Sequence, residues 1–261
     1  MNGSAHMARR PHLPSSVARR IDARRTRSFL NLIGPPTRAY VERYGLQVRH
    51  GPLEGMFYLP GLEATLGDLV AKLLGAYEAE LHPALERWIR SRATRVIDVG
   101  SAEGYYAVGL AHAMPQAKVY AYDIDAEARA RCAQLAALND CADRVVIGGE
   151  CTPQTLEEHP ADDVLLFSDC EGYERVLLDP AATDRLARWS ILVELHEFLD
   201  LGITDVLDAR FRSTHDIELI EGVLRDGAAY PELAEVPDRE RRALLSENRP
   251  GAMRWMALTP R

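Results

Sequence analysis

One segment constrains the fold of this chain more than any other. It runs from Val96 to Tyr106 and reads VIDVGSAEGYY. A short apolar run ends in an acid, a glycine turn follows, and helix-forming residues continue to Pro115. In doubly wound α/β folds, a strand, a glycine turn and a helix in this order open a nucleotide-sized crevice at the carboxyl end of the first strand. The segment therefore predicts an α/β domain with a ligand crevice at residues 98–104.

The sequence after this segment alternates apolar runs with helical patterns, which is typical of a parallel sheet covered on both faces. We expect helices at 105–113 and 126–138, and another that starts after Thr152 with Pro153 in its first turn. The expected strands are 96–99, 119–123, 144–148, 163–169, 190–195, 217–220 and 254–258. The last two would pair antiparallel around a loop at 221–252. The predicted fold is α/β, a doubly wound, Rossmann-like sheet of seven strands with a C-terminal antiparallel hairpin.

The first 40 residues are expected to form a basic, partly irregular arm, because four prolines interrupt any long helix up to residue 38. They are Pro11, Pro14, Pro35 and Pro36. Residues 1–49 carry ten arginines against two acids, a net charge of +8, so the rest of a chain with net charge −8 carries −16. The arm lacks interleaved aromatic residues, and the acidic body would repel phosphate. We therefore expect a disordered or docked arm and no nucleic-acid partner.

Residues 41–91 are expected to form an N-terminal cap before the main sheet. The pattern over 46–59 indicates a hairpin. Thr65 would cap a helix whose apolar positions, from 66 to 77, follow helical spacing. Pro83 would start a second helix. Caps of this kind, together with late insertions, build the substrate pockets of doubly wound folds.

Bulk features indicate a cytoplasmic protein. No run of about 18 apolar residues is present, so no membrane span is expected. No secretory signal precedes the first predicted elements. Four cysteines, without the spacing of a metal site, indicate free thiols in a reducing compartment. Homo-oligomerisation is left open.

The residues around the glycine turn indicate which ligand the crevice takes. Gly100 and Gly104 let a ligand approach the backbone, and Asp98 ends the first strand. Asp123 ends the second strand, where a carboxylate can accept both hydroxyls of a ribose. The turn lacks the third glycine of the dinucleotide fingerprint, which argues against a pyrophosphate ligand. Glu150, after the third strand, stands where an adenine would be bracketed.

Acids gather at the ends of the next two strands. Asp169 and Glu171 follow the fourth strand, and Glu194 and His196 end the fifth with the same orientation, two residues apart. Strands four and five border the crevice beside strand one. We expect these side chains to converge on a reacting centre, the alternative being a solvated strand end.

Three segments together resemble the FkbM-type S-adenosylmethionine (SAM) methyltransferases: 96–106, 168–174 (SDCEGYE) and 191–196 (ILVELH). The resemblance covers about 92–200, so the main domain, 92–261, is identified as SAM-binding. It implies cofactor contacts from Asp98, Gly100, Glu103 and Asp123, with Ser101 and Gly104 in the turn that wraps the methionine end. It also implies that Asp169 and Glu171 face the reacting centre. One departure is Asp123, where the family commonly has glutamate followed by proline.

The resulting hypothesis is methyl transfer from SAM to a hydroxyl of a small molecule of specialised metabolism. His196 is the expected base, with Asp169 or Glu171 as alternates. A divalent cation held by Asp169 and Glu194 is a further option, although the spacing of these acids matches no dedicated metal-binding motif. An N-methyltransferase that acts on an amine or guanidine, and a non-catalytic SAM-binding protein, remain alternatives. An NAD-dependent oxidoreductase is disfavoured by the missing glycine.

Overall fold

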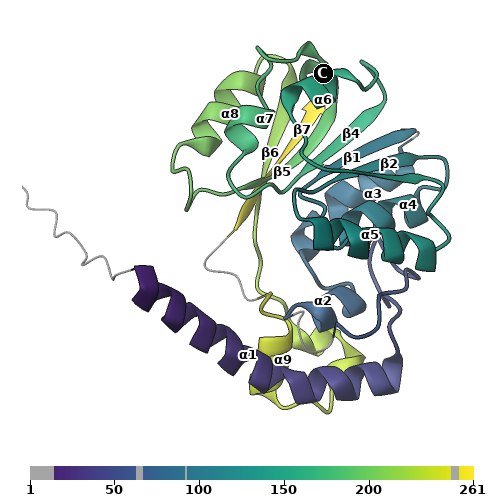
Figure 1. Cartoon of the computed structure of the whole chain (residues 1–261), viewed down its shortest axis with the longest axis vertical. Helices are drawn as coiled ribbons and strands as arrows, with labels where there is room; N and C mark the ends of the chain where they lie inside the picture. Colours follow the sequence, from purple (N-terminus) through teal and green to yellow (C-terminus); the bar gives the residue numbers. More distant parts are fainter. Residues whose placement is uncertain (1–14, 63–66, 92, 248–252) are drawn as a thin grey trace, which may run out of the picture.

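The computed structural model describes residues 15–62, 67–91, 93–247 and 253–261, with side chains from residue 28 onward. Its centre is one mixed sheet of seven strands (Figure 1). They are β1 (Arg95–Val99), β2 (Lys118–Tyr122), β3 (Val145–Gly148), β4 (Val164–Ser168), β5 (Ser190–Leu195), β6 (His215–Glu221) and β7 (Arg254–Pro260). Their order is β3-β2-β1-β4-β5-β7-β6, in which β7 runs antiparallel to β5 and β6 and all other neighbouring strands are parallel. This confirms the predicted fold class, including the C-terminal hairpin.

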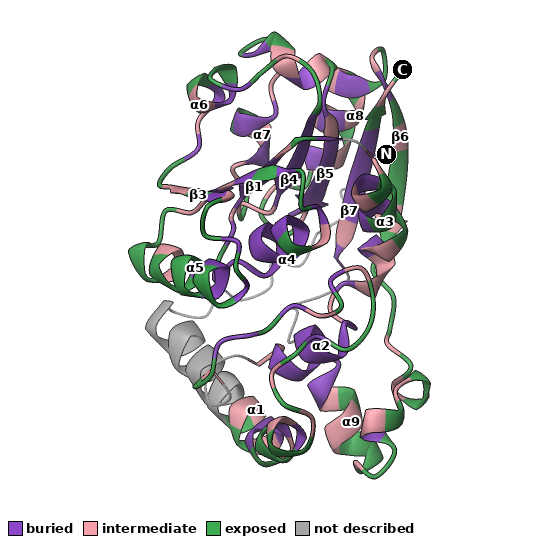
Figure 2. Cartoon of the chain, turned by 90° about the vertical axis from the view of Figure 1, so that its right-hand side faces the viewer, coloured by how far each residue is buried: buried purple, intermediate pink, exposed green. Residues whose placement is uncertain are grey.

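Helices cover both faces of the sheet, and Figure 2 shows β4 and β5 largely buried and the edge strand β6 largely exposed. They are α3 (His82–Arg90), α4 (Tyr105–Ala113) and α5 (Ala126–Leu138) on one face, and α6 (Pro153–Glu157), α7 (Glu174–Leu177) and α8 (Ile203–Phe211) on the other. Successive strand residues point to opposite faces, so Val96 and Ile97 belong to two different hydrophobic clusters. Burial on both faces explains why the strands read as continuous apolar runs.

Several helices begin at the residues predicted from the sequence, because their capping signals are local. Helices α4 and α5 have the predicted bounds. Helix α6 begins after Thr152, whose hydroxyl accepts a hydrogen bond from the Thr155 backbone N–H in a capping box. Asp125 caps α5 in the same manner, by accepting from the Glu127 N–H.

The arm differs from the prediction. Ser15–Tyr44 form one helix, α1, in place of the irregular chain expected. Pro35 and Pro36 lie inside it, where each removes a donor and costs about 3 kcal/mol. Packing of α1 against α2 (Leu69–Leu74) and α9 (Asp238–Leu244) offsets this cost. The α1 residues buried by that packing share one helical face: Ile33, Thr37 and Tyr40.

No helix among the described residues, α1 included, is long and apolar enough to cross a membrane. Residues 1–14, the remainder of the predicted arm, lie outside the described residues.

Helix α2 of the cap and a C-terminal insertion (residues 222–247), which contains α9, lie together below the sheet in Figure 1, whereas α3 lies against the sheet. Gln47 and Phe57 form the antiparallel bridge of the expected hairpin. Helix α3 has its proline in the first turn, as predicted, whereas the expected cap residue Thr65 lies outside the described residues. The short helices are η1 (Ala79–Leu81), η2 (Asp184–Ala187), η3 (Gly227–Ala229) and η4 (Pro231–Leu233).

A buried ion pair network joins the insertion to the cap. The Arg225 guanidinium lies 2.5 Å from Glu80 and 2.8 Å from Glu247, and all three side chains are about 5% exposed. Its Nε also donates to the carbonyl oxygen of Ala76 at 2.6 Å. The two segments that the sequence associated with the substrate pocket are therefore fixed to each other.

Candidate active site

A cavity of about 460 Å³ opens at the carboxyl ends of β1 to β4. Each strand contributes the residues that directly follow it, so side chains far apart in the sequence share one wall. Five predicted site residues line it: Gly100, Asp123, Glu150, Asp169 and Glu171. The structure thus places a cavity where the glycine turn predicted the crevice.

The two glycines of the turn are required by packing within the protein. Both have positive φ, 84° at Gly100 and 100° at Gly104. A Cβ on Gly100 would lie 1.7 Å from the carbonyl oxygen of Asp169, and one on Gly104 would lie 2.8 Å from the sulfur of Cys132. The sequence argument attributed these glycines to ligand approach. The structure adds a second reason: the missing Cβ atoms let the β1 turn pack against the β4 loop and α5.

Asp98 and Ser101 lie behind the cavity wall and are 1% and 5% exposed. Asp98 Oδ2 and Ser101 Oγ are each buried without a hydrogen-bond partner in the described part of the chain. Burial, followed by the charges of Asp169 and Asp123, raises the pKa of Asp98 to about 8. An orphaned buried carboxylate oxygen is costly, and a cationic ligand group would satisfy it.

Asp123 and Glu150 both line the cavity, Asp123 directly after β2 and Glu150 shortly after β3. Asp123 Oδ2 accepts from the Ala102 N–H and Oδ1 from the Asp125 N–H, both at 2.8 Å. A carboxylate offers about four acceptor sites, so two remain for ribose hydroxyls. Glu150 is exposed, and a Cβ on the preceding Gly149 would meet nothing within 4 Å, so this wall has room for a planar base.

Glu103 belongs to a different environment from the one predicted. Its carboxylate accepts from Lys72 Nζ at 2.6 Å and from the Tyr58 hydroxyl, and Lys72 also lies 2.9 Å from Asp68. Burial alone would raise the Glu103 pKa, but Lys72 lowers it to about 2. Glu103, predicted as a cofactor contact, is not among the residues that line the cavity, and in the structure it links the glycine turn to the cap. Lys72, the one charged residue in apolar α2, was the signal that the sequence reading missed.

The acids at the ends of β4 and β5 surround the imidazole ring of His196. Its Nε2 lies 3.3 Å from Asp169, 3.4 Å from Glu194 and 3.8 Å from Glu171. The ring is 2% exposed, whereas the Glu171 side chain is 78% exposed. Burial alone would lower the His196 pKa, but the carboxylates of Asp169 and Glu174 raise it to about 10. The predicted convergence of the four candidate catalytic residues is therefore present in the structure.

Two further glutamates lie next to the acid cluster. Glu174 begins α7 and lies 2.7 Å from His196 Nδ1. Its side chain is 1% exposed, so it fixes the ring from behind. Glu197, which directly follows His196, pairs with Arg254 and Thr204. The sequence could not separate these two, because both flank the cluster.

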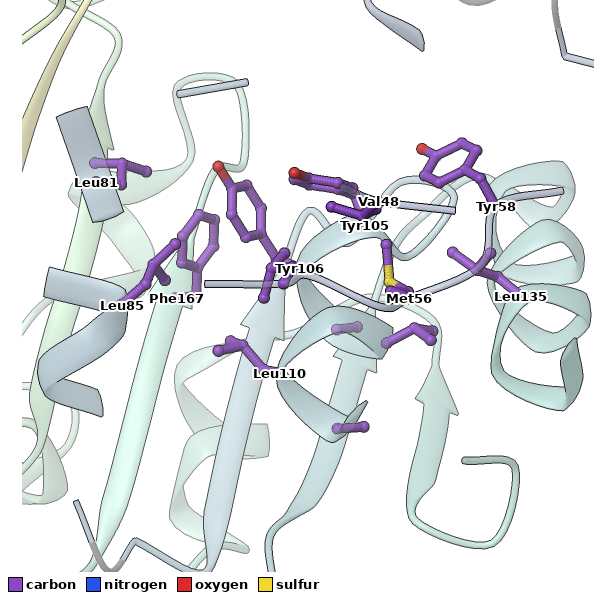
Figure 3. Packing of buried hydrophobic residues seen from close by; sticks show 14 of the residues in the cluster. Val48, Met56, Tyr58, Leu81, Leu85, Tyr105, Tyr106, Leu110, Leu135 and Phe167 are labelled. Atoms are coloured by element: carbon purple, nitrogen blue, oxygen red, sulfur yellow. The ribbon is translucent and has the colours of Figure 1, made fainter. Parts of the chain in front are cut away.

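A row of aromatic side chains lies between the strand ends and the cap. Figure 3 shows Tyr58, Tyr105 and Tyr106 above the strand tips, with Phe167 beside Tyr106. The ring centroids of Tyr106 and Phe167 are 4.3 Å apart, and those of Phe167 and Trp255 are 5.1 Å apart. Trp255 stands opposite Glu194 in the β5–β7 register. The aromatic row therefore extends to the acid cluster.

The cysteines are free thiols in the structure, as predicted. Cys151 and Cys170 line the cavity. Burial raises the pKa of Cys151 to about 12, and burial with the charge of Glu174 raises that of Cys170. A protonated thiol is a poor nucleophile, and in this structure Cys151 and Cys170 form part of the cavity wall.

Comparison with known proteins gives similarities of fold alone. No protein-family model and no curated protein matches the sequence. Among solved structures, a putative O-methyltransferase from Klebsiella pneumoniae is 13% identical, with a TM-score of 0.46 over 88% of this chain and 90% of its own. The O-methyltransferase TomG from Streptomyces achromogenes, involved in tomaymycin synthesis and solved with SAM, is 14% identical, with a TM-score of 0.48 over 75% and 88%. A SAM-dependent methyltransferase from Geobacter sulfurreducens, solved with S-adenosylhomocysteine, is 18% identical, with a TM-score of 0.45 over 70% and 90%.

Proposed function

We propose that this chain is a SAM-dependent methyltransferase. The observation that carries the proposal is the pair of carboxylates at the ends of adjacent strands. Asp98 has an orphaned buried oxygen and Asp123 has spare acceptor capacity beside a cavity of about 460 Å³. An ammonium and a ribose in one ligand would satisfy both. The sheet order, with its reversed seventh strand, is the methyltransferase variant of the doubly wound fold.

The residues present fit SAM. Asp98 would hold the ammonium of the methionine portion, Ser101 in the turn would offer it a further hydrogen bond, and Asp123 would hold the ribose. Glu150 would border the adenine at the open wall. When bound, SAM supplies an electrophilic methyl group, and its transfer to an acceptor oxygen leaves S-adenosylhomocysteine and a proton. Alignment of donor and acceptor by the cavity then supplies several kcal/mol.

The proton of the acceptor would go to Asp169 in preference to His196. Asp169 lines the cavity, whereas the His196 ring is 2% exposed and its Nδ1 is held by Glu174. Glu171 also lines the cavity and is the alternate acceptor. His196, with Glu194 beside it, would act by holding these carboxylates in place. This changes the expected base from a histidine to a carboxylate.

The acceptor is proposed to be a hydroxyl of a small molecule of specialised metabolism, as the FkbM-type resemblance implies. One observation favours the alternative, an amine or guanidine acceptor. Four carboxylates lie within 3.8 Å of the His196 ring nitrogens, and such a cluster attracts cations. A cytoplasmic location, the division into an arm (1–40), a cap (41–91) and a SAM-binding domain (92–261), and self-association remain proposals from the sequence.

Mass spectrometry of acceptor panels tests the function. The full chain is incubated with SAM and matched sets of hydroxyl and amine acceptors, and a mass gain of one methyl group is sought together with S-adenosylhomocysteine. We expect methylated hydroxyl products, with turnover about 100-fold lower in Asp169→Asn and unchanged in Glu158→Gln, because Glu158 is an exposed acid that directly follows α6. Products from amines alone would favour the alternative. SAM binding without turnover of any acceptor, unaffected by Asp169→Asn, would identify a non-catalytic SAM-binding protein.

A further inference from the structure

We propose that Asp169, Glu171 and His196 form a divalent-cation site that prefers Mn²⁺ or Zn²⁺ to Mg²⁺. One ligand atom from each of the three residues lies within 4.8 Å of the other two. His196 Nε2 is 3.3 Å from Asp169 Oδ1 and 3.8 Å from Glu171 Oε2. Ligands bonded to one ion at about 2.1 Å stand about 3–4 Å apart, so these atoms need to move little to share a cation.

The orientation of the imidazole supports a ligand role. His196 Nδ1 is 2.7 Å from Glu174 Oε1, and both side chains are almost fully buried. A carboxylate on one ring nitrogen fixes the ring and directs the other nitrogen at the metal, which is how metal-bound histidines are usually held. Here the second nitrogen, Nε2, points at Asp169 and Glu171, and the proton on it would be released to solvent when the ion binds. Glu194 Oε2, 3.4 Å from Nε2, offers a further oxygen on the same side.

The charge balance of the cluster also favours a cation. Three other acids with buried side chains lie close to a full cation: Glu103 has Lys72, and Glu80 and Glu247 have Arg225. At the ends of β4 and β5, four carboxylates lie within 3.8 Å of one imidazole, which carries at most one positive charge. Clustered like charges are costly at partly buried sites, and a divalent ion compensates two of them at once.

The composition of the site selects the metal. Carboxylate oxygens alone suit Mg²⁺ and Ca²⁺, whereas an imidazole nitrogen favours transition metals. Two carboxylates with one histidine therefore suit Mn²⁺ or Zn²⁺ better than Mg²⁺. An ion can reach the site, because Asp169 and Glu171 line the cavity and their side chains are 29% and 78% exposed. That the ion holds the acceptor oxygen is an inference that rests on the proposed function. The binding of the ion to the protein does not depend on that function.

Titration of the full chain with Mn²⁺, followed by electron paramagnetic resonance in the absence of SAM, tests the site. We expect one bound Mn²⁺ per chain with spin-echo modulation from one coordinated nitrogen. Glu171→Gln and Asp169→Asn should each weaken Mn²⁺ binding about tenfold or more. Glu174→Gln should weaken it as well, because the His196 ring would be held less firmly. Glu158→Gln should leave the affinity unchanged. Zn²⁺ should displace Mn²⁺, whereas Mg²⁺ in about tenfold excess over Mn²⁺ should not.

Three results would overturn the proposal: no bound Mn²⁺ at millimolar concentration, binding that survives both Glu171→Gln and Asp169→Asn, or equal displacement by Mg²⁺. Glu171 is exposed, so Glu171→Gln keeps the test valid even where Asp169→Asn fails to fold. Calorimetry with S-adenosylhomocysteine runs in parallel. A chain that binds Mn²⁺ but no S-adenosylhomocysteine would contradict the proposed function and still support the cation site.

Discussion

At the scale of single residues, Asp98 shows a conflict between stability and binding. Its pKa is raised from 3.8 to about 8 by burial and by neighbouring acids. The folded state therefore holds this proton more tightly than the unfolded state, and stability falls as pH rises from about 4 to 8. At pH 9 we expect the free energy of unfolding of Asp98→Asn to exceed that of the wild type by on the order of a few kcal/mol. At pH 5 the two free energies should differ less. Urea unfolding at both pH values measures this, and a less stable variant at pH 9 would refute it.

Gly100 offers a residue-scale test of the packing in the turn. Gly100→Ala places a Cβ 1.7 Å from the Asp169 carbonyl oxygen at a φ of 84°. We expect a loss of at least about 2 kcal/mol in the free energy of unfolding, because neither backbone segment can yield without moving a strand end. Gly149→Ala is the matched control, since its Cβ meets nothing within 4 Å. Equal melting temperatures for the two variants would show that the packing argument is wrong.

At the scale of elements, one buried pair connects α2 to the glycine turn. Lys72→Met leaves Glu103 and Asp68 without their cation, so we expect a loss of about 3–5 kcal/mol in the free energy of unfolding. The chain's other lysine, Lys118, is exposed at the start of β2, and Lys118→Met should cost less than about 0.5 kcal/mol. Chemical denaturation compares them. A loss below 1 kcal/mol for Lys72→Met would mean that water reaches the pair.

The elements also show what the sequence could and could not predict. Helices α4, α5 and α6 were placed closely because their caps are local: a glycine turn, Asp125 and the Thr152–Pro153 pair. Helix α1 was missed because Pro35 argues against a helix, and only its packing on α2 and α9 reverses that. The contact between Lys72 and Glu103 spans 31 positions and has no local signature.

At the scale of the whole molecule, Arg225 holds the insertion to the cap. Arg225→Met removes the guanidinium that lies beside the buried carboxylates of Glu80 and Glu247. We expect faster amide hydrogen exchange in 67–91 and 222–247, with β1, β4 and β5 still protected, because the hydrophobic cluster between these strands and α6 to α8 contains no residue of either segment. Exchange followed by mass spectrometry measures both regions. Uniform acceleration across the chain would instead indicate that cap and sheet unfold as one unit.

The site as a whole was predictable to the extent that topology brings strand ends together. Asp123, Asp169 and Glu194 each terminate an apolar run, and parallel strands end at one edge, so their proximity follows from the pattern. The direction of each side chain does not follow. Glu103 turns to the cap and Glu174 turns to His196 because of neighbours that only the folded chain supplies.

The central claim, that the crevice binds an adenosyl cofactor, is tested most directly by calorimetric titration of the full chain with S-adenosylhomocysteine at pH 7, with NAD as the comparison. We predict one bound S-adenosylhomocysteine per chain, with release of about one proton as Asp98 meets the ammonium. Asp123→Ala should weaken binding about 10- to 100-fold, because both ribose hydroxyls lose a charged acceptor. Binding of NAD without S-adenosylhomocysteine, or of neither at millimolar concentration, would contradict the account.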